Sequence, residues 1–185
     1  PKAAPQAELA KVRMPEASGT RVIADAGVVV DASNTNSGYV MVRSAPNEKL
    51  LKTRVSNGDG AYNYDQRADN AFETYPLQMG DGTYTIRVME HVENDLYAVM
   101  YGIELDVLLA DQTMPFLYPN QYVWYDENSE AVQKAWELAG GLTSERDIAE
   151  SLYRFVVKSM TYDTEKAKTV QKGYLPDADQ SLESG

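Results

Sequence analysis

The stretch Tyr97-Ala98-Val99-Met100-Tyr101-Gly102-Ile103-Glu104-Leu105-Asp106-Val107 decides the fold class, because it is the longest alternating run in the sequence. Its odd-numbered apolar side chains are separated by residues that include Glu104 and Asp106, which predicts one core face and one solvent face. Gly102 interrupts the run, and we expect a bulge or kink there. The run therefore indicates a half-buried β-strand.

Shorter segments of the same kind fill the chain from Thr20 to Leu109. Strand-forming residues occur at positions 28–30, 39–43, 51–55, 61–64, 72–77 and 84–88. Turn signals separate them, and Asn57-Gly58-Asp59-Gly60 predicts a two-residue hairpin connection. About seven short strands without a helical period predict an antiparallel β-sandwich over residues 20–113. Residues 1–19 are expected to be a flexible tether of the kind that follows a removed secretion signal.

One hexapeptide, Asp81-Gly82-Thr83-Tyr84-Thr85-Ile86, resembles the entry to a late strand of immunoglobulin-like sandwiches. In those domains a tyrosine hydroxyl bonds to nearby backbone and fixes the corner. The sequence lacks the flanking Cys and Trp of antibody domains, so the resemblance concerns architecture. We expect an immunoglobulin-like β-sandwich.

An aromatic and proline-rich segment over residues 114–127 is predicted to join the β-sandwich to a helical region. It contains Phe116, Tyr118, Tyr122, Trp124 and Tyr125. These rings carry too much apolar surface for a free linker, so we expect the segment to be packed.

Two helices are predicted after the joining segment. Asn128-Ser129 is typical of a helix start and Gly140-Gly141 of a helix end. A hydroxyl of Thr143-Ser144 can cap a second helix, whose apolar residues share one face: Ile148, Leu152, Phe155, Val156 and Met160. This αα-hairpin has too little core to be stable alone, so we expect exposed apolar surface and consider self-association through these helices.

The second helix is followed by Thr161-Tyr162-Asp163, a polar segment over residues 164–172 that we expect to be a loop, and Gly173-Tyr174-Leu175-Pro176-Asp177. This order resembles the opening of a bacterial transglutaminase-like domain, a papain-related fold, and the resemblance covers residues 116–185. In that family a Gly-x-Cys motif normally follows, with the Cys at the N-terminus of a buried helix. The resemblance implies that residues 128–185 are the first helices of an incomplete α+β domain, truncated before the catalytic cysteine.

The resemblance also implies that four side chains lie at the edge of a cleft: Tyr162, Asp163, Tyr174 and Asp177. A structural alternative is equally open, in which Tyr162 fills the space under the helix end and Asp177 caps a turn. No catalytic residue is expected within the chain, because the 185 residues contain no cysteine.

Charge and composition exclude several classes of function. With 28 acidic and 17 basic residues the net charge is −11, which argues against binding to nucleic acid or to anionic lipid. The absence of cysteine excludes disulfides, thiolate zinc sites and thiol nucleophiles in these residues. No run of about 18 apolar residues is present, so no transmembrane segment is expected.

Two weaker site hypotheses concern metals. His91 is the only histidine and is expected to face outward near a strand end rather than to bind metal or act as a base. Several oxygen-bearing side chains could attract Ca²⁺: Asn57, Asp59, Asp65, Asp69, Asn70 and Glu73. Their spacing does not match an EF-hand, and Asx turns are the alternative, so no metal or other cofactor is expected.

The leading hypothesis is a non-catalytic N-terminal portion of a secreted or cell-envelope transglutaminase-like protein. By that resemblance, the parent would perform cysteine-dependent acyl transfer or amide hydrolysis on proteins or peptides. The alternative is a cell-surface binding or adhesion module for a glycan or a protein, with Trp124, Tyr122 and Tyr118 as partner-binding residues. A cysteine-free scaffold without any catalytic half is a third possibility. Expected partners are a protein, a peptide or a cell-wall component, at an extracellular or cell-surface location.

Overall fold

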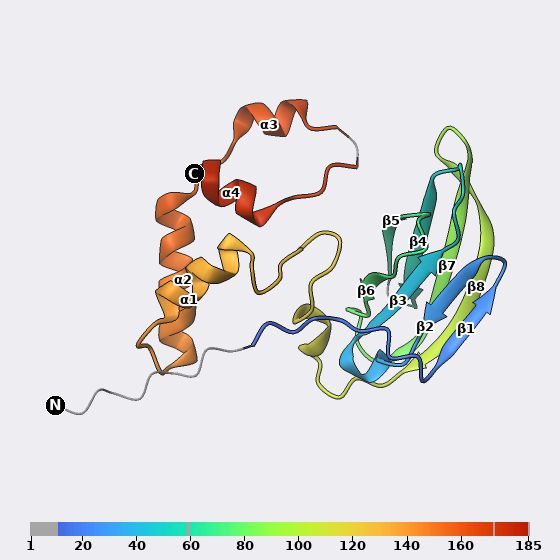
Figure 1. Cartoon of the computed structure of the whole chain (residues 1–185), viewed down its shortest axis with the longest axis horizontal. Coiled ribbons are helices and arrows are strands. Elements are labelled where there is room, and N and C mark those ends of the chain that lie inside the picture. Colours follow the sequence, from blue (N-terminus) through green and yellow to red (C-terminus); the bar gives the residue numbers. More distant parts are fainter. Residues whose placement is uncertain (1–10, 59, 172, 185) are drawn as a thin grey trace. The chain divides into compact units, whose positions relative to one another are not determined.

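The computed structural model describes residues 11–58, 60–171 and 173–184. These residues are mainly β, with two antiparallel sheets and four α-helices (Figure 1). They divide into two compact units, Arg13–Gln121 and a second unit that contains the residues from Tyr122 onward. The first, here called the β unit, holds the strands, and the second, here called the helical unit, holds the α-helices.

Each sheet of the β unit has four strands among the described residues. The first sheet has the order β1 (Val22–Asp25), β2 (Val28–Asp31), β3 (Tyr39–Ser44) and β6 (Glu73–Pro76). The second sheet has the order β5 (Gly60–Gln66), β4 (Leu51–Asn57), β7 (Gly82–Glu93) and β8 (Leu96–Val107). Neighbouring strands are antiparallel, as the alternating sequence predicted.

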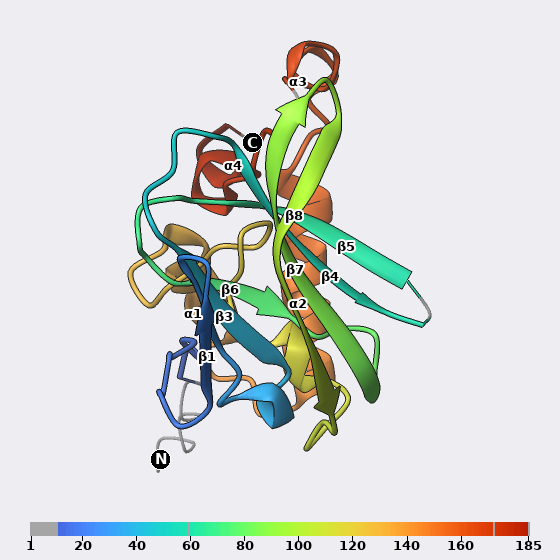
Figure 2. The same ribbon diagram turned by 90° about the vertical axis from the view of Figure 1, so that its right-hand side faces the viewer.

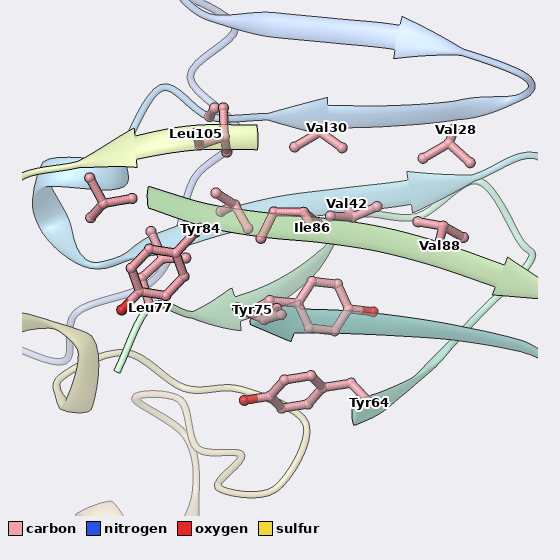
Figure 3. Packing of buried hydrophobic residues seen from close by; sticks show 14 of the residues in the cluster. Val28, Val30, Val42, Tyr64, Tyr75, Leu77, Tyr84, Ile86, Val88 and Leu105 are labelled. Atoms are coloured by element: carbon pink, nitrogen blue, oxygen red, sulfur yellow. The ribbon is translucent and has the colours of Figure 1, made fainter. Parts of the chain in front are cut away.

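The two sheets share one apolar core. It consists of inward side chains from both sheets and the adjoining loops: Val28, Val30, Ala32, Val40, Val42, Val55, Tyr64, Tyr75, Leu77, Tyr84, Ile86, Val88, Leu105, Val107 and Leu109. Figure 3 shows Val28 and Val30 of β2 on one side of this core and Ile86 and Val88 of β7 on the other. Burial of this apolar surface is the main force that holds the sheets together.

The predicted Asn57–Gly60 hairpin is confirmed, because these two residues pair across β4 and β5. Asp59, in its turn, lies outside the described residues. Strand β1 was not predicted, since its four residues are mostly exposed and carry little alternation. It pairs with β2 through the Ala26-Gly27 turn, where both residues have left-handed φ angles of 49° and 77°.

Strand β8 departs from a regular alternation at Met100, not at Gly102 as predicted. Gly102 stays in register opposite Arg87, whereas Tyr101 pairs with Val88 and Val99 with Met89, so Met100 is an extra residue. Leu105 and Val107 are therefore buried, but Val99 is 57% exposed on the opposite face. The expectation of one continuous core face along the whole run is wrong for this end of the strand.

Beyond Glu90, β7 and β8 pair only with each other among the described strands, since β4 ends its pairing there. Figure 2 shows this long twisted hairpin, whose turn reaches past the neighbouring strands. The expected tyrosine bond to backbone is present at the start of β7. The hydroxyl of Tyr84 accepts the Met79 N–H at 2.8 Å and donates to the Gly80 carbonyl at 2.9 Å.

Residues 13–19, which precede β1, are part of the β unit and are held to it by hydrogen bonds. The Gly19 N–H donates to the Asp31 carboxylate at 2.7 Å, and the Asn34 side chain donates to the Glu16 carbonyl at 2.8 Å. Asn34 precedes a short 3₁₀ helix, η1 (Thr35–Ser37). Residues 1–10 of the predicted tether lie outside the described residues.

The predicted joining segment is packed at some of its residues, which include the half-buried Tyr125 in its second half. It opens with a 3₁₀ helix, η2 (Met114–Phe116), in which Pro115 is buried. Tyr118 lies against Tyr39 with ring centroids 4.7 Å apart. Gln121 makes two hydrogen bonds to the backbone of Asp65, at 3.0 and 2.7 Å, along the edge of β5. Phe116, in contrast, is 64% exposed, so the expectation of packing is wrong for that ring.

The helical unit contains α1 (Glu130–Ala139), α2 (Glu145–Ser159), α3 (Thr164–Thr169) and α4 (Ala178–Ser184). The first two form the predicted hairpin, with Gly140 and Gly141 between them. Ser144 supplies the predicted hydroxyl cap of α2 by accepting the Asp147 N–H, whereas the Ser129 hydroxyl bonds to Asp126 instead of capping α1. The expected loop over residues 164–172 is wrong, because α3 occupies most of it, and the tail forms α4.

Candidate functional site

The four predicted cleft-edge residues lie in the segments that precede α3 and α4. Asp163 caps α3 by accepting the Lys166 N–H at 2.8 Å. Asp177 caps α4 by accepting the N–H groups of Asp179 and Gln180 at 2.9 and 3.1 Å. Both carboxylates are thus used to satisfy free backbone groups at helix starts.

The two tyrosines of this set differ in their surroundings. Tyr174 lies beneath the Lys166 ammonium, which is 4.8 Å from the ring centroid and 2.9 Å from the Gln180 side-chain oxygen. Tyr162 is 78% exposed, so it does not fill the space under the end of α2. No hydrogen bond or ring contact within the described chain joins the four predicted residues to one another.

An open groove of about 420 Å³ lies within the helical unit, between α1, α2 and α4. Its lining is Glu130, Gln133, Lys134, Glu137, Phe155, Leu182 and Glu183. Phe155 and Leu182 are half-buried and supply its apolar surface, and the remaining side chains are polar or charged. The groove therefore combines an apolar surface with an acidic rim.

Contacts among the lining residues fix much of this groove. The Lys134 ammonium lies 2.8 Å from the Glu137 carboxylate and 5.4 Å from the Phe155 ring centroid. Helix α4 is held to the start of α1 because the Asp179 carboxylate accepts the Ala131 N–H at 2.9 Å. We did not predict the groove from the sequence. Its signal is the polar spacing of Glu130, Gln133, Lys134 and Glu137 on one side of α1.

The predicted partner-binding aromatics fall in both units. Tyr118 is half-buried against Tyr39 in the β unit. Tyr122, Val123 and Trp124 open the helical unit and are 44%, 60% and 57% exposed. Three consecutive large apolar side chains with this exposure form a surface that a ligand can reach.

No protein-family model, curated protein or solved structure matches this chain. Within the described residues, no helix has both the length and the apolar character needed to cross a bilayer.

Apart from Asp59, which lies outside the described residues, the oxygen-bearing residues considered for Ca²⁺ have partners within the protein. Asp65 pairs with the Lys52 ammonium, and the Glu73 carboxylate accepts from the Arg67 backbone and from the Gln66 side chain. Asn57 donates to the Met79 carbonyl at 3.0 Å. Across the part of the chain that the structure describes, no three acidic, His or Cys side chains cluster in a way that would hold a metal ion.

His91 is half-buried near the end of β7, where its Nε2 lies 2.8 Å from the Asn94 carbonyl oxygen. Its ring meets the Tyr97 ring edge-on, with centroids 5.3 Å apart. Both contacts stabilise the β7–β8 turn, which agrees with the expected place near a strand end.

Proposed function

We propose that this chain is the non-catalytic N-terminal portion of a secreted or cell-envelope transglutaminase-like protein. In this proposal the β unit is an immunoglobulin-like sandwich, and the helical unit is the first layer of a papain-related domain. The supporting observation is the exposure of apolar side chains on α2.

Helix α2 is apolar on two sides. Ile148, Leu152 and Phe155 are half-buried, but Tyr153, Val156 and Val157 are 69%, 51% and 60% exposed. None of the described residues from 122 to 184 is fully buried. A helix that is apolar on more than one side is typical of the interior of a larger fold, so the second stripe is suited to cover by further chain.

The bond from Tyr84 to the backbone of Met79 and Gly80 supports the immunoglobulin-like half of the proposal. A tyrosine near the start of a late strand, bonded to backbone a few residues upstream, is a hallmark of those sandwiches. The shared core of two antiparallel sheets is consistent with the same architecture.

In the complete protein, by the resemblance, a downstream cysteine thiolate would attack an amide, and an amine or water would resolve the thioester. The present residues contain no cysteine, so their part would be to position that domain and its substrate. Amine-incorporation and amide-hydrolysis assays on the pure 185-residue chain should give no turnover. Turnover by pure material would overturn the proposal.

Hydrogen exchange gives a second test. In a longer protein that continues past Gly185, the backbone amides of α2 should exchange much more slowly than in the 185-residue chain, because the Tyr153–Val157 side becomes covered. Equal exchange rates in the two proteins, or a continuation without a Gly-x-Cys motif, would contradict the transglutaminase-like assignment. Concentration-dependent protection in the short chain would instead indicate self-association through α2.

A second candidate function is a binding module for a cell-surface glycan or protein, and the exposed Tyr122-Val123-Trp124 run favours it. Planar aromatic rings offer a large contact area at a low cost in conformational entropy. Binding to a glycan array or to cell-wall fragments should be lost in Trp124→Ala and retained in Tyr153→Ala, which removes an equally accessible ring from α2. Equal binding by both variants would exclude the Tyr122–Trp124 surface.

A further inference from the structure

Two arginines lie directly opposite each other on the outer face of the second sheet. Arg54 of β4 pairs with Arg87 of β7 in the antiparallel register. Their sequence neighbours Thr53, Val55 and Val88 are buried in the core, so both arginine side chains project from the other side of the sheet. Side chains of such directly opposed residues begin about 4.5–5.5 Å apart at Cβ.

This placement is unfavourable without a counter-ion. Like charges directly opposite each other destabilise a sheet, and no ion pair joins either guanidinium to a carboxylate of the described residues. The cation next along β4, Lys52, is by contrast paired with Asp65. The chain carries 28 acidic residues, yet the two opposed arginines are left without one.

The immediate surroundings fix the position of the two arginines. Gly102 lies opposite Arg87 on β8 and has no side chain, so the Arg87 stem packs over it, and a Cβ placed there would lie 3.4 Å from the Arg87 Cγ. On the other flank, Arg54 lies 3.4 Å from the side-chain oxygen of Asn63. Ser56 and Thr85, one side-chain step away on the same face, add hydroxyl groups.

We propose that Arg54 and Arg87 form a binding site for a phosphate or sulfate group. Each guanidinium presents several N–H donors in a planar fork, and two forks that converge on one ligand need more acceptor oxygens than the two of a carboxylate. A tetrahedral oxyanion supplies them. The net charge of −11 repels long polyanions, so the group belongs to a small ligand, either free phosphate or a sugar phosphate.

The site can be tested by titrating the whole chain with inorganic phosphate at low ionic strength, using amide chemical shifts and calorimetry. Saturable shifts are expected at Arg54, Arg87 and Gly102. Arg87→Gln should weaken binding by at least about tenfold, and Arg54→Gln by a similar factor. Arg21→Gln serves as the control of equal charge change and should bind like the unaltered chain. Arg21 is an exposed arginine of the same unit, and its side chain makes no hydrogen bond or ion pair with a described residue.

Two further arms make the result decisive. Titration with glucose 6-phosphate identifies the source of the group. Tighter binding of glucose 6-phosphate than of inorganic phosphate would indicate a sugar phosphate, and binding of inorganic phosphate that is at least as tight would indicate the free ion. Acetate should bind much more weakly, and equal binding of acetate would overturn the assignment to a tetrahedral group. Equal weakening by Arg21→Gln, or unchanged binding in Arg87→Gln, would show only general charge attraction and would end the proposal.

Discussion

The hydroxyl of Tyr75 donates to the side-chain oxygen of Gln66 at 2.8 Å, inside the β unit. Thr53 donates to the same oxygen at 2.8 Å, and the Gln66 amide donates to Glu73 at 3.0 Å. Tyr75, Gln66 and Thr53 are buried, so each polar group depends on the others for its hydrogen bonds. A network of this kind is costly to break, because water cannot replace a lost partner.

Tyr75→Phe removes one donor from this network and should lower the free energy of unfolding by about 1–2 kcal/mol. Urea unfolding followed by circular dichroism measures the change. Tyr62→Phe, on the accessible part of β5, is the matched control and should change the stability by less than about 0.5 kcal/mol. Equal effects of the two substitutions would show that the buried Tyr75 hydroxyl stabilises the fold no more than the exposed Tyr62 hydroxyl does.

Alkaline pH should destabilise the β unit through the same residue. Burial, followed by the nearby Glu73 charge, raises the pKa of Tyr75 well above its ordinary value. A tyrosine whose folded pKa is raised contributes stability that is complete below the unfolded value of about 10 and is lost as pH rises through the folded pKa. The stability difference between the unaltered chain and Tyr75→Phe should therefore shrink above about pH 10, in urea titrations at successive pH values.

Asp31 should contribute to the loss of stability at acidic pH. Burial raises the pKa of this carboxyl, but hydrogen bonds from Ser33 and from the Gly19 N–H outweigh burial, so its pKa is lowered. The stability it contributes is present above the unfolded value of about 3.9 and is lost as pH falls through the folded pKa. Asp31→Asn should cost about 1–3 kcal/mol at neutral pH, and less at pH values below about 4. Glu48→Gln, an exposed site, should show neither effect.

Substitution of Gly38 tests how closely Pro115 of the joining segment packs against β-unit backbone. The φ of Gly38 is +86°, and a Cβ added there would lie 2.6 Å from the backbone nitrogen of Pro115. Gly38→Ala should therefore lower the free energy of unfolding by about 3 kcal/mol or more, because the backbone is strained and η2 is displaced. Gly19 has a similar φ of +73°, but a Cβ added there would meet no atom within 4 Å. Gly19→Ala should therefore lower the free energy of unfolding by only about 1–2 kcal/mol. Thermal unfolding of the two variants separates the clash from the strain.

Asp179 tests the attachment of α4 to α1. Its carboxylate caps α1 through the Ala131 N–H, so Asp179→Ala should destabilise this end of the helical unit by about 1 kcal/mol. Faster amide exchange in α1 and α4, with α2 unchanged, is the expected readout. Glu165→Ala, on exposed α3, is the control, and equal loosening of α1 in that variant would contradict the role of Asp179.

Alternation and turn residues were sufficient to predict the antiparallel β-strands, because period-two patterns and Gly-rich turns are local signals. Strand β1 was missed because it buries little, and α3 because a six-residue polar helix has no apolar stripe. Asp163 could have indicated α3, since a side chain that accepts an N–H three residues later marks a helix start. The Met100 bulge depends on the register of β7, which the sequence of β8 does not contain.

The candidate sites depend still more on pairing between distant segments. Arg54 and Arg87 each look like ordinary outward residues, and only the register of β4 against β7 makes them opposed. The groove likewise needs α4 beside α1, which rests on the Asp179 bond. Tyr162 shows the opposite case, because a sequence resemblance singled it out but no hydrogen bond, ion pair or ring contact within the described chain holds its side chain.

The extra residue Met100 reverses which side chains of β8 point inward in the outer part of the β7–β8 hairpin, here called the arm. On its Val107 side, odd-numbered side chains point inward, and on its Leu96 side odd-numbered side chains point outward, which brings Tyr97 within 5.6 Å of the Lys52 ammonium. Deleting this single residue would exchange the inward and outward side chains of β8 on its Leu96 side. The arm's chemistry toward its environment is thus encoded by a count of residues rather than by their identity.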